Sequence, residues 1–162
     1  DVTGMVAEAV ELAGIELRRR NVRLSHYIAA RLPTLLVDPI LIEQVLVNLM
    51  KNAAESIDHA NLPPARRNVE LRVVPRQAEG LAVIEFSVAD TGPGLAPEAL
   101  ERLFEAFFST KSEGMGIGLN LCRSIVESHQ GRMRAENIYN GSDVMGCRFS
   151  FWIPVANPAL SP

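Results

Sequence analysis

Glycine residues recur at every second position just before a helical pattern in the second half of the chain. Gly114, Gly116 and Gly118 run into an apolar stripe of Leu121, Cys122, Ile125 and Val126, and Gly131 ends the pattern. Such a loop is suited to holding phosphate, because glycine N–H groups approach closely and a helix N-terminus carries partial positive charge. The spacing matches neither GxGxxG nor GxxxxGKS/T, so phosphate binding in another kind of fold and a plain turn before a helix both remain open.

A narrow polar stripe lies along the mostly apolar helix predicted to follow Asp38-Pro39. At helical spacing its members are Gln44, Asn48, Lys51, Asn52 and Glu55. A solvated face is one interpretation, but such a face usually carries Glu, Lys and Arg rather than asparagine. Asn48 and Asn52 would instead present neutral carbonyl oxygens one turn apart, which suit a hard cation such as Mg²⁺ that arrives with phosphates.

An acidic residue ends the apolar strand predicted for residues 81–90. Strand periodicity puts Asp90 on the same face as Ile84, Phe86 and Val88. A carboxylate at the end of a buried face needs a hydrogen-bond donor, because an unpaired buried charge is very costly. DTGPGL follows, so Asp90 either binds a ligand or caps its own turn.

A third segment, LFEAFFSTK, carries Phe104, Phe107 and Phe108 before Lys111. The aromatic residues are most simply core residues or a hinge for the loop that follows. Lys111 lies just before the glycine loop, where it could reach a phosphate or remain solvated.

The elements that must position these residues follow from periodicity and turn signals. Helices are predicted at 1–20, 38–58, 97–107 and 118–130, and strands at 22–29, 69–73, 81–90, 132–138 and 147–155. Residues 108–116 are predicted to form a loop, and a turn is expected within 140–146. Strands that neighbour across turns, with helices in separate blocks, indicate an α+β sandwich with a mixed, mostly antiparallel sheet.

Composition bounds the class of protein. The 162 residues are 48% hydrophobic and 22% charged with a net charge of −3, as in one soluble domain without a polycationic surface for nucleic acid. No apolar run has the length of a membrane span, and no signal peptide is visible. Cys122 and Cys147 are expected to be buried free thiols in a reducing compartment. We expect one domain over 1–156 and a frayed tail over 157–162. The parent protein is expected to be longer and this part of it to be cytoplasmic, and whether the parent is anchored to a membrane stays open.

Taken in order, four segments resemble the ATP-binding catalytic domain of bacterial sensor histidine kinases. QVLVNLMKNAAESI resembles the asparagine box of that family, DTGPGL its first glycine box, LFEAFFSTK its phenylalanine box and GMGIGL its second glycine box. The nitrogen-regulation, oxygen-sensing and dicarboxylate-sensing group is the most similar. The resemblance covers roughly Val2 to Pro154. It implies the Bergerat fold, a two-layer sandwich with helices on one face of the sheet, and ATP bound beneath a lid over about 96–115.

The resemblance implies a role for each matched residue. Asn52 would coordinate Mg²⁺, with Asn48 beside it near the phosphates, and Lys51 and Lys111 would contact phosphate; Asn48, Lys51 and Lys111 are thus the catalytic candidates. Asp90 would accept a hydrogen bond from the adenine amino group. The remaining nucleotide-binding candidates are Gly92 and Gly94 near the base and, against the phosphates, Gly114, Met115, Gly116, Gly118 and Leu119.

Phosphoryl transfer needs a nucleophile, and His26, His59 and His129 lack the acid-flanked helical context of the family's phosphoacceptor site. The resemblance implies an acceptor histidine in a separate dimerisation domain of a homodimeric parent, a response regulator downstream, and a fragment that is itself monomeric. One alternative is a Bergerat ATPase, which resembles this chain but carries a Glu near the position of Asn48, where an amide cannot act as a base. A second is a pseudokinase that works as an interaction module.

Overall fold

The computed structural model describes residues 1–104 and 115–156, with the side chains of 115–117 left out of the description. In chain order the elements are α1 (Val2–Arg19), β1 (Arg23–Ile28), α2 (Pro39–His59), the 3₁₀ turn η1 (Pro64–Arg66), β2 (Asn68–Ala78), β3 (Leu81–Asp90), α3 (Pro97–Arg102), α4 (Met115–Ser128), β4 (Arg132–Asn140) and β5 (Asp143–Pro154). Within these ranges no helix is both long and apolar enough to cross a membrane.

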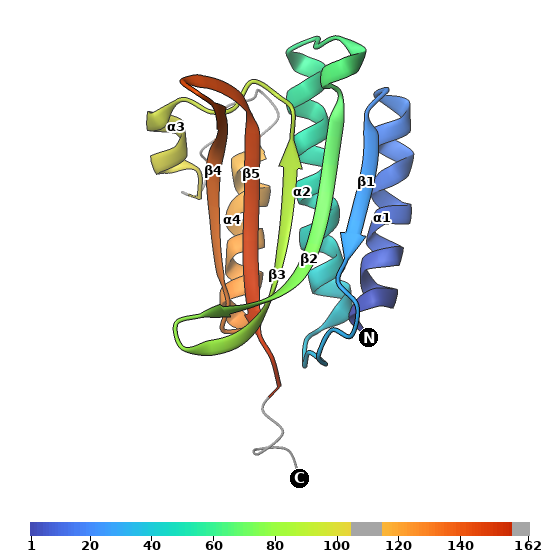
Figure 1. Cartoon of the computed structure of the whole chain (residues 1–162), viewed down its shortest axis with the longest axis vertical. Coiled ribbons are helices and arrows are strands. Elements are labelled where there is room, and N and C mark those ends of the chain that lie inside the picture. The colour runs from blue at the N-terminus through green and yellow to red at the C-terminus, as the bar shows by residue number, and fades with distance from the viewer. Residues whose placement is uncertain (105–114, 157–162) are drawn as a thin grey trace.

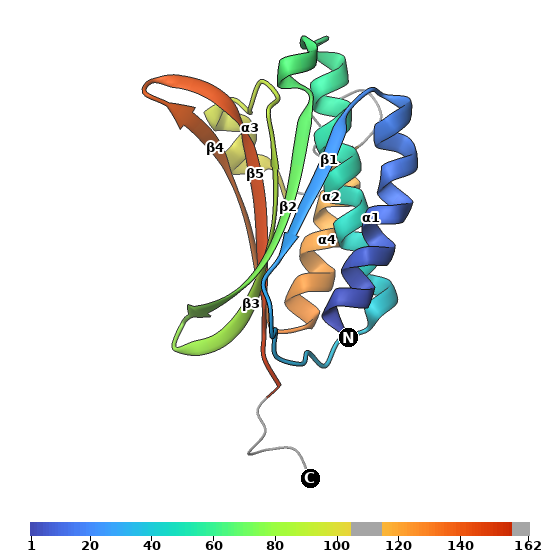
Figure 2. The same ribbon diagram turned by 45° about the vertical axis from the view of Figure 1, so that its right-hand side comes forward.

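The strands form one sheet in the order β1-β2-β3-β5-β4. β1 runs parallel to β2, and the other neighbouring pairs are antiparallel. Helices α1, α2 and α4 cover one face of this sheet, and among the described residues no helix layer covers the opposite face (Figures 1 and 2). The predicted α+β sandwich with a mixed, mostly antiparallel sheet is therefore confirmed.

Helix α2 lies at the centre of the helix layer, and its sequence explains both its start and its burial. Asp38 caps it, because its carboxylate accepts the backbone N–H groups of Ile40 and Leu41 at 3.1 and 3.3 Å, and Pro39 takes the first helical position. Its apolar side is buried against the sheet, where the rings of Phe86 and Phe151 stack with centroids 4.8 Å apart.

Two element boundaries near the predicted site differ from the expectation. Helix α4 begins at Met115, so Met115 and Gly116 belong to its first turn rather than to a preceding loop. The first-turn N–H groups have no partner within the helix, which is why glycine at this end does not prevent helix formation. β5 begins at Asp143, because the turn after β4 is closed by Gly141 at φ +66° and needs no more residues.

Other differences are smaller. α3 ends at Arg102, earlier than predicted, and the predicted helical residues 105–107 and loop residues 108–114 lie outside the described residues, as does the tail from 157. Leu121, placed in the buried stripe of α4 by its periodicity, is 51% exposed. Leu119, Cys122 and Val126 form the buried line of α4, and Leu121 lies roughly a third of a turn away from Cys122.

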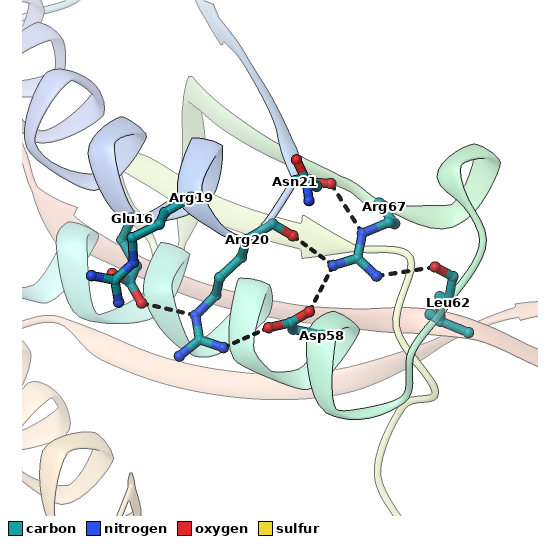
Figure 3. Close-up of polar contacts among 7 residues, drawn as sticks. All are labelled: Glu16, Arg19, Arg20, Asn21, Asp58, Leu62 and Arg67. Carbon is teal, nitrogen blue, oxygen red and sulfur yellow. Dashed lines mark hydrogen bonds and ion pairs between the residues drawn. The ribbon is translucent and has the colours of Figure 1, made fainter.

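A network of charged groups joins the ends of α1 and α2 (Figure 3). Arg20 contacts Glu16 and Asp58 at 2.8 Å each, and Arg67 contacts Asp58 at 2.8 Å. Arg67 also donates to the carbonyl oxygens of Arg20, Asn21 and Leu62. The hydrogen bond from Arg67, followed by that from Arg20, holds the pKa of Asp58 below its usual value. The network therefore fastens α1 and the start of β2 to the far end of α2.

His129 performs a similar task at the other end of the helix layer. Its Nδ1 donates to the carbonyl of Ile125 at 2.8 Å, and its Nε2 accepts the backbone N–H of Asp38 at 3.1 Å. This side chain thereby ties the end of α4 to the start of α2, which confirms its expected structural role. His26 and His59 are exposed, as expected.

Candidate functional site

A cavity lies between α2, the carboxyl end of β3, β5 and the start of α4. Its lining residues are Asn52, Ala53, Ser56, Asp90, Gly94, Leu95, Leu103, Leu119, Cys147 and Phe149. Four of the residues singled out from the sequence, Asn52, Asp90, Gly94 and Leu119, thus meet in one place. The walls are mostly apolar, with the Asp90 carboxylate, the Asn52 amide and the Ser56 hydroxyl as polar groups.

Asp90 is only 6% exposed, and backbone groups hold its carboxylate. Oδ1 accepts the N–H of Gly92 at 2.8 Å and the N–H of Cys147 at 3.3 Å. The first bond closes the Asx turn that the sequence allowed, and the second comes from the neighbouring strand β5. The carboxylate is therefore held in one orientation at the cavity wall and accepts hydrogen bonds there.

The backbone after Asp90 turns tightly around this group. Gly94 has φ +75°, and a Cβ at that position would overlap the Val144 side chain, so only glycine fits. Asn137 of β4 fixes the next residue by accepting the Leu95 N–H at 2.9 Å and donating to the Leu95 carbonyl at 2.7 Å. Gly92 is buried next to the Asp90 carboxylate and does not line the cavity.

A second group of bonds supports this turn from the segment before β2. Arg66 donates to the carbonyl oxygens of Thr91 and Gly92 at 3.0 and 3.3 Å. The Thr91 hydroxyl donates to the Arg66 carbonyl at 2.6 Å and accepts the Asn68 N–H at 3.1 Å. The turn that carries Asp90 is therefore held between β5 on one side and η1 on the other.

Helix α2 supplies the opposite wall of the cavity. Asn52 is 8% exposed and lines it, and Ser56 lies one turn further along the same face. Asn48, one turn before Asn52, is half-buried, and its Nδ2 donates to the Cys122 Sγ of α4 at 3.7 Å. A nitrogen that donates to sulfur leaves the amide oxygen of Asn48 available to a ligand or to water.

Lys51 does not line the cavity in the part of the chain that the structure describes. Its charge acts instead on Glu16 of α1, whose pKa is lowered mainly by the hydrogen bond from Arg20 and also by Lys51. Its predicted role in holding phosphate therefore stays a prediction.

The two cysteines border the site without taking part in it as nucleophiles. Both are free and buried, as predicted. Burial raises the pKa of Cys122 to about 11 and that of Cys147 to about 12, the latter also through the nearby Asp90 charge. Neither thiol forms a thiolate near neutral pH.

The glycine-rich candidates fall partly outside the described residues. Lys111 and Gly114 lie there, and for Met115 and Gly116 the structure describes only the backbone of the first turn of α4. A Cβ at Gly118 would meet open space, and the neighbouring Leu119 lines the cavity. The N-terminal turn of α4, with its unpaired N–H groups, is thus at the border of the cavity.

Some residues of the site were missed by sequence reasoning. They are Ser56, Arg66, Leu95, Leu103, Asn137, Gly146, Cys147 and Phe149, together with Cys122 as the partner of Asn48. Ser56 could have been found, because it continues the line of Asn48 and Asn52 at a spacing of four. Gly146 could not: its need for glycine arises because a Cβ there would overlap the Asp90 carbonyl oxygen across the β3–β5 pair.

The donor set limits which metal this site could take. Among residues 1–104 and 115–156 no group of three or more His, Cys, Asp or Glu side chains could hold an ion. A cation here would take an amide oxygen from the protein and its other ligands from water and from the bound molecule. That chemistry suits Mg²⁺ carried by phosphates.

Residues 37–157 match the protein family described as histidine kinase-, DNA gyrase B- and HSP90-like ATPase. The chain is 42% identical over 133 residues to the C4-dicarboxylate transport sensor protein DctS of Rhodobacter capsulatus, which covers 82% of the chain and 19% of that protein. It is 38% identical over 151 residues to the sensor protein FixL of Bradyrhizobium diazoefficiens, covering 93% and 27%. The chain therefore spans less than a third of the length of these relatives.

Comparison with solved structures leads to the same family of proteins. The chain is similar to full-length ShkA in complex with AMPPNP, with a TM-score of 0.74 and 28% identity over 99% of the chain and 32% of that protein. It is also similar to the catalytic domain of histidine kinase ThkA, with a TM-score of 0.73 and 28% identity over 95% of the chain and 92% of that domain. With its cavity, buried carboxylate and asparagine helix, the chain belongs to the histidine kinase-, DNA gyrase B- and HSP90-like ATPase family, as an ATP-binding catalytic domain of the sensor histidine kinase type.

Proposed function

We propose that this chain holds Mg²⁺-ATP in the cavity between α2 and β3 and transfers the γ-phosphoryl group to a histidine of a separate dimerisation domain in the parent kinase. The observation that carries the proposal is the Asp90 carboxylate, buried at the wall of an apolar cavity that Asn52 and the first turn of α4 also border. The nucleotide analogue in the ShkA structure supports the same class of ligand.

The adenine base would occupy the apolar part of the cavity. Asp90 accepts hydrogen bonds, and the backbone N–H groups of Gly92 and Cys147 fix its orientation. An amino group on the base supplies a donor for this carboxylate, and the side chains of Leu95 and Phe149 supply apolar surface for the ring. Recognition of the base is therefore separate from recognition of the phosphates.

The phosphates would extend from there toward α4. Asn52 offers its amide group at the cavity wall and would hold the Mg²⁺, with Asn48 one turn away. Bound Mg²⁺ supplies neutralisation of the phosphate charge. The N–H groups of the first turn of α4 and the lysines Lys51 and Lys111 would hold the phosphate oxygens in line for transfer.

The cavity favours transfer to another protein group over hydrolysis. Among the described lining residues Asp90 is the sole carboxylate, and backbone bonds hold it at the base-binding end. Asn48 is an amide without useful basicity, so it cannot activate water. His129 is engaged by Ile125 and Asp38, and the exposed His26 and His59 do not line the cavity. The phosphoacceptor is then a histidine elsewhere in a homodimeric, cytoplasmically exposed parent, which passes the group to a response regulator.

The test uses the full-length parent kinase and the isolated chain side by side. We expect the isolated chain to bind Mg²⁺-ATP and to hydrolyse it very slowly, and the parent to become labelled on histidine from γ-labelled ATP. Asn52→Ala should abolish labelling and weaken ATP binding in the presence of Mg²⁺. Rapid steady-state hydrolysis by the isolated chain, lost in Asn52→Ala, would identify an ATPase and overturn the proposal. ATP binding without labelling of the parent would identify a pseudokinase.

A further inference from the structure

The face of the sheet opposite the helices carries a concentration of positive charge. Strands β2 to β5 direct five arginines and three glutamates to this side: Arg72, Arg76, Arg132, Arg134 and Arg148 with Glu70, Glu85 and Glu136. The whole chain has a net charge of −3, so this face has the opposite sign from the remainder of the molecule. The sheet also curves, with both hairpin ends leaning away from the helices, so the face is concave (Figure 2).

One part of this concave face is a cavity. Its lining includes Arg76 and Glu85 on one side, Arg132 and Arg134 on the other, and Ser150 and Trp152 of β5 between them. The strand register explains the arrangement, because Arg132 is directly opposite Trp152 and Arg134 directly opposite Ser150. Adjacent strands place such pairs about 5 Å apart.

The floor of the cavity carries a polar side chain between the arginines. Ser150 lines the cavity and is 3% exposed as a whole residue. Its hydroxyl can donate a hydrogen bond to an acidic group that binds in the cavity.

The charges around the cavity are unequally paired. Arg76 forms an ion pair with Glu85 at 3.1 Å. Arg132 donates only to the neighbouring Gly131 carbonyl at 2.8 Å, and Arg134 has no ion pair or hydrogen bond within the described part of the chain. Two guanidinium groups on one strand are therefore available, two residues apart on the same face, which is a separation of about 7 Å.

We propose that this cavity binds an extended acidic segment of a protein partner, with carboxylates at alternate positions paired to Arg132 and Arg134. An extended chain repeats its side chains at the same spacing of about 7 Å, so two carboxylates can meet the two guanidinium groups together. Arginine pairs with carboxylate through two parallel N–H bonds, Ser150 supplies a further donor, and Trp152 offers apolar surface to the backbone of the segment.

A single phosphate fits less well. Its double negative charge would be concentrated at one point close to Glu85, whose side chain is 15% exposed and lines the same cavity. The Glu85 carboxylate would repel that charge. Separate carboxylates distribute the charge along β4, away from Glu85. The site faces away from the nucleotide cavity, which lies on the helix side of the sheet, so the two binding events can be tested separately.

The test is a titration of the isotope-labelled chain by NMR with a short peptide that carries glutamate at alternate positions. We expect saturable shifts of the backbone amides in 132–134 and 150–152, weakened by salt, because the contacts are between exposed charges. Arg134→Ala should weaken peptide affinity on the order of tenfold, the equivalent of about 1.4 kcal/mol. The control variant is Arg148→Ala, which removes an arginine of the same face that is paired with Glu136 at 3.3 Å and does not line the cavity.

Four outcomes would overturn the proposal. They are the absence of saturable shifts, equal binding of the matched glutamine peptide, an equal loss in Arg148→Ala, and inorganic phosphate or duplex DNA binding in place of the peptide. ATP binding by Arg134→Ala is measured in parallel. It should equal that of the wild-type chain, which shows that the variant is folded and keeps this test independent of the proposed kinase function.

Discussion

Replacing Asp90 by asparagine tests the base-recognition argument most directly. Asparagine keeps an oxygen acceptor for the N–H groups of Gly92 and Cys147, which lie 2.8 and 3.3 Å from Oδ1 in the native chain. The loss of charge assistance on these two bonds costs about 1–2 kcal/mol of stability. Natural domains have about 5–15 kcal/mol, so the variant remains folded.

The effect on nucleotide affinity should be larger. In the variant an amide nitrogen replaces one carboxylate oxygen, and a donor then faces the adenine amino group, which is itself a donor. Losing a hydrogen bond to a charged group costs about 1.5–3 kcal/mol, and leaving a buried donor unpaired costs about 1–3 kcal/mol more. The two costs together are about 2.5–6 kcal/mol, so we expect ATP affinity to fall by about 100-fold or more, with little change for inorganic tripolyphosphate, which has no base.

Isothermal titration with ATP and with tripolyphosphate, alongside thermal unfolding, separates the two effects. Asp143→Asn serves as a control, because it makes the same chemical change at an exposed position at the start of β5. An ATP affinity within about threefold of the wild-type value would refute the reasoning. So would a parallel loss of tripolyphosphate affinity, since that would show a general collapse of the site.

Five further variants test other parts of the structure. Arg66→Ala should lower ATP affinity several-fold because the Asp90 turn loses two hydrogen bonds, whereas Arg67→Ala should lower only the melting temperature; equal effects of both on affinity would contradict this. Stability should fall as pH rises from 9 toward 12, because Cys147 titrates at about 12 when folded and near 9.0 when unfolded. Cys147→Ala should reduce this alkaline loss by about 2 kcal/mol at pH about 10.5 in urea unfolding, and an unchanged pH profile would contradict the assignment. His129→Ala should cost about 1–2 kcal/mol of unfolding free energy through its two hydrogen bonds, and a smaller change would show that solvent replaces them. Gly116→Ala should weaken ATP binding without lowering the melting temperature, and wild-type affinity would mean that the first turn of α4 does not approach the phosphates.

Periodicity and turn signals predicted the main helices and strands and most of the residues that they bury, with Leu121 as an exception. Asn52 follows from its spacing of four after Asn48 in a helix, and Asp90 follows from alternation in a strand. The cavity that Asn52 and Asp90 share requires only that α2 pack over β3. Local turn chemistry likewise predicted Gly94, which has positive φ. Each of these inferences uses residues close together in the sequence.

What could not be predicted depends on contacts between distant segments. Arg66 supports a turn 25 residues further along the chain, and Gly146 is required by the carbonyl of a residue on a neighbouring strand. The early start of α4 at Met115 was missed because average propensities count glycine as unfavourable throughout a helix, although the first turn differs. The cavity at Ser150 needs the β4–β5 register, which no local pattern contains.

The pairing of β1 with β2 has a consequence for the order of folding. Its register joins Arg23 to Asn68 across an intervening helix, whereas the β2–β3 and β4–β5 pairs are closed by short turns. Closing the long loop loses more chain entropy, so the hairpins should form early and the α1–β1 unit should join last. The charged network at Asp58 in Figure 3 then secures a unit that arrives late. Amide hydrogen exchange should accordingly be fastest, among the sheet strands, in β1, so this edge of the domain can open while the nucleotide cavity stays intact.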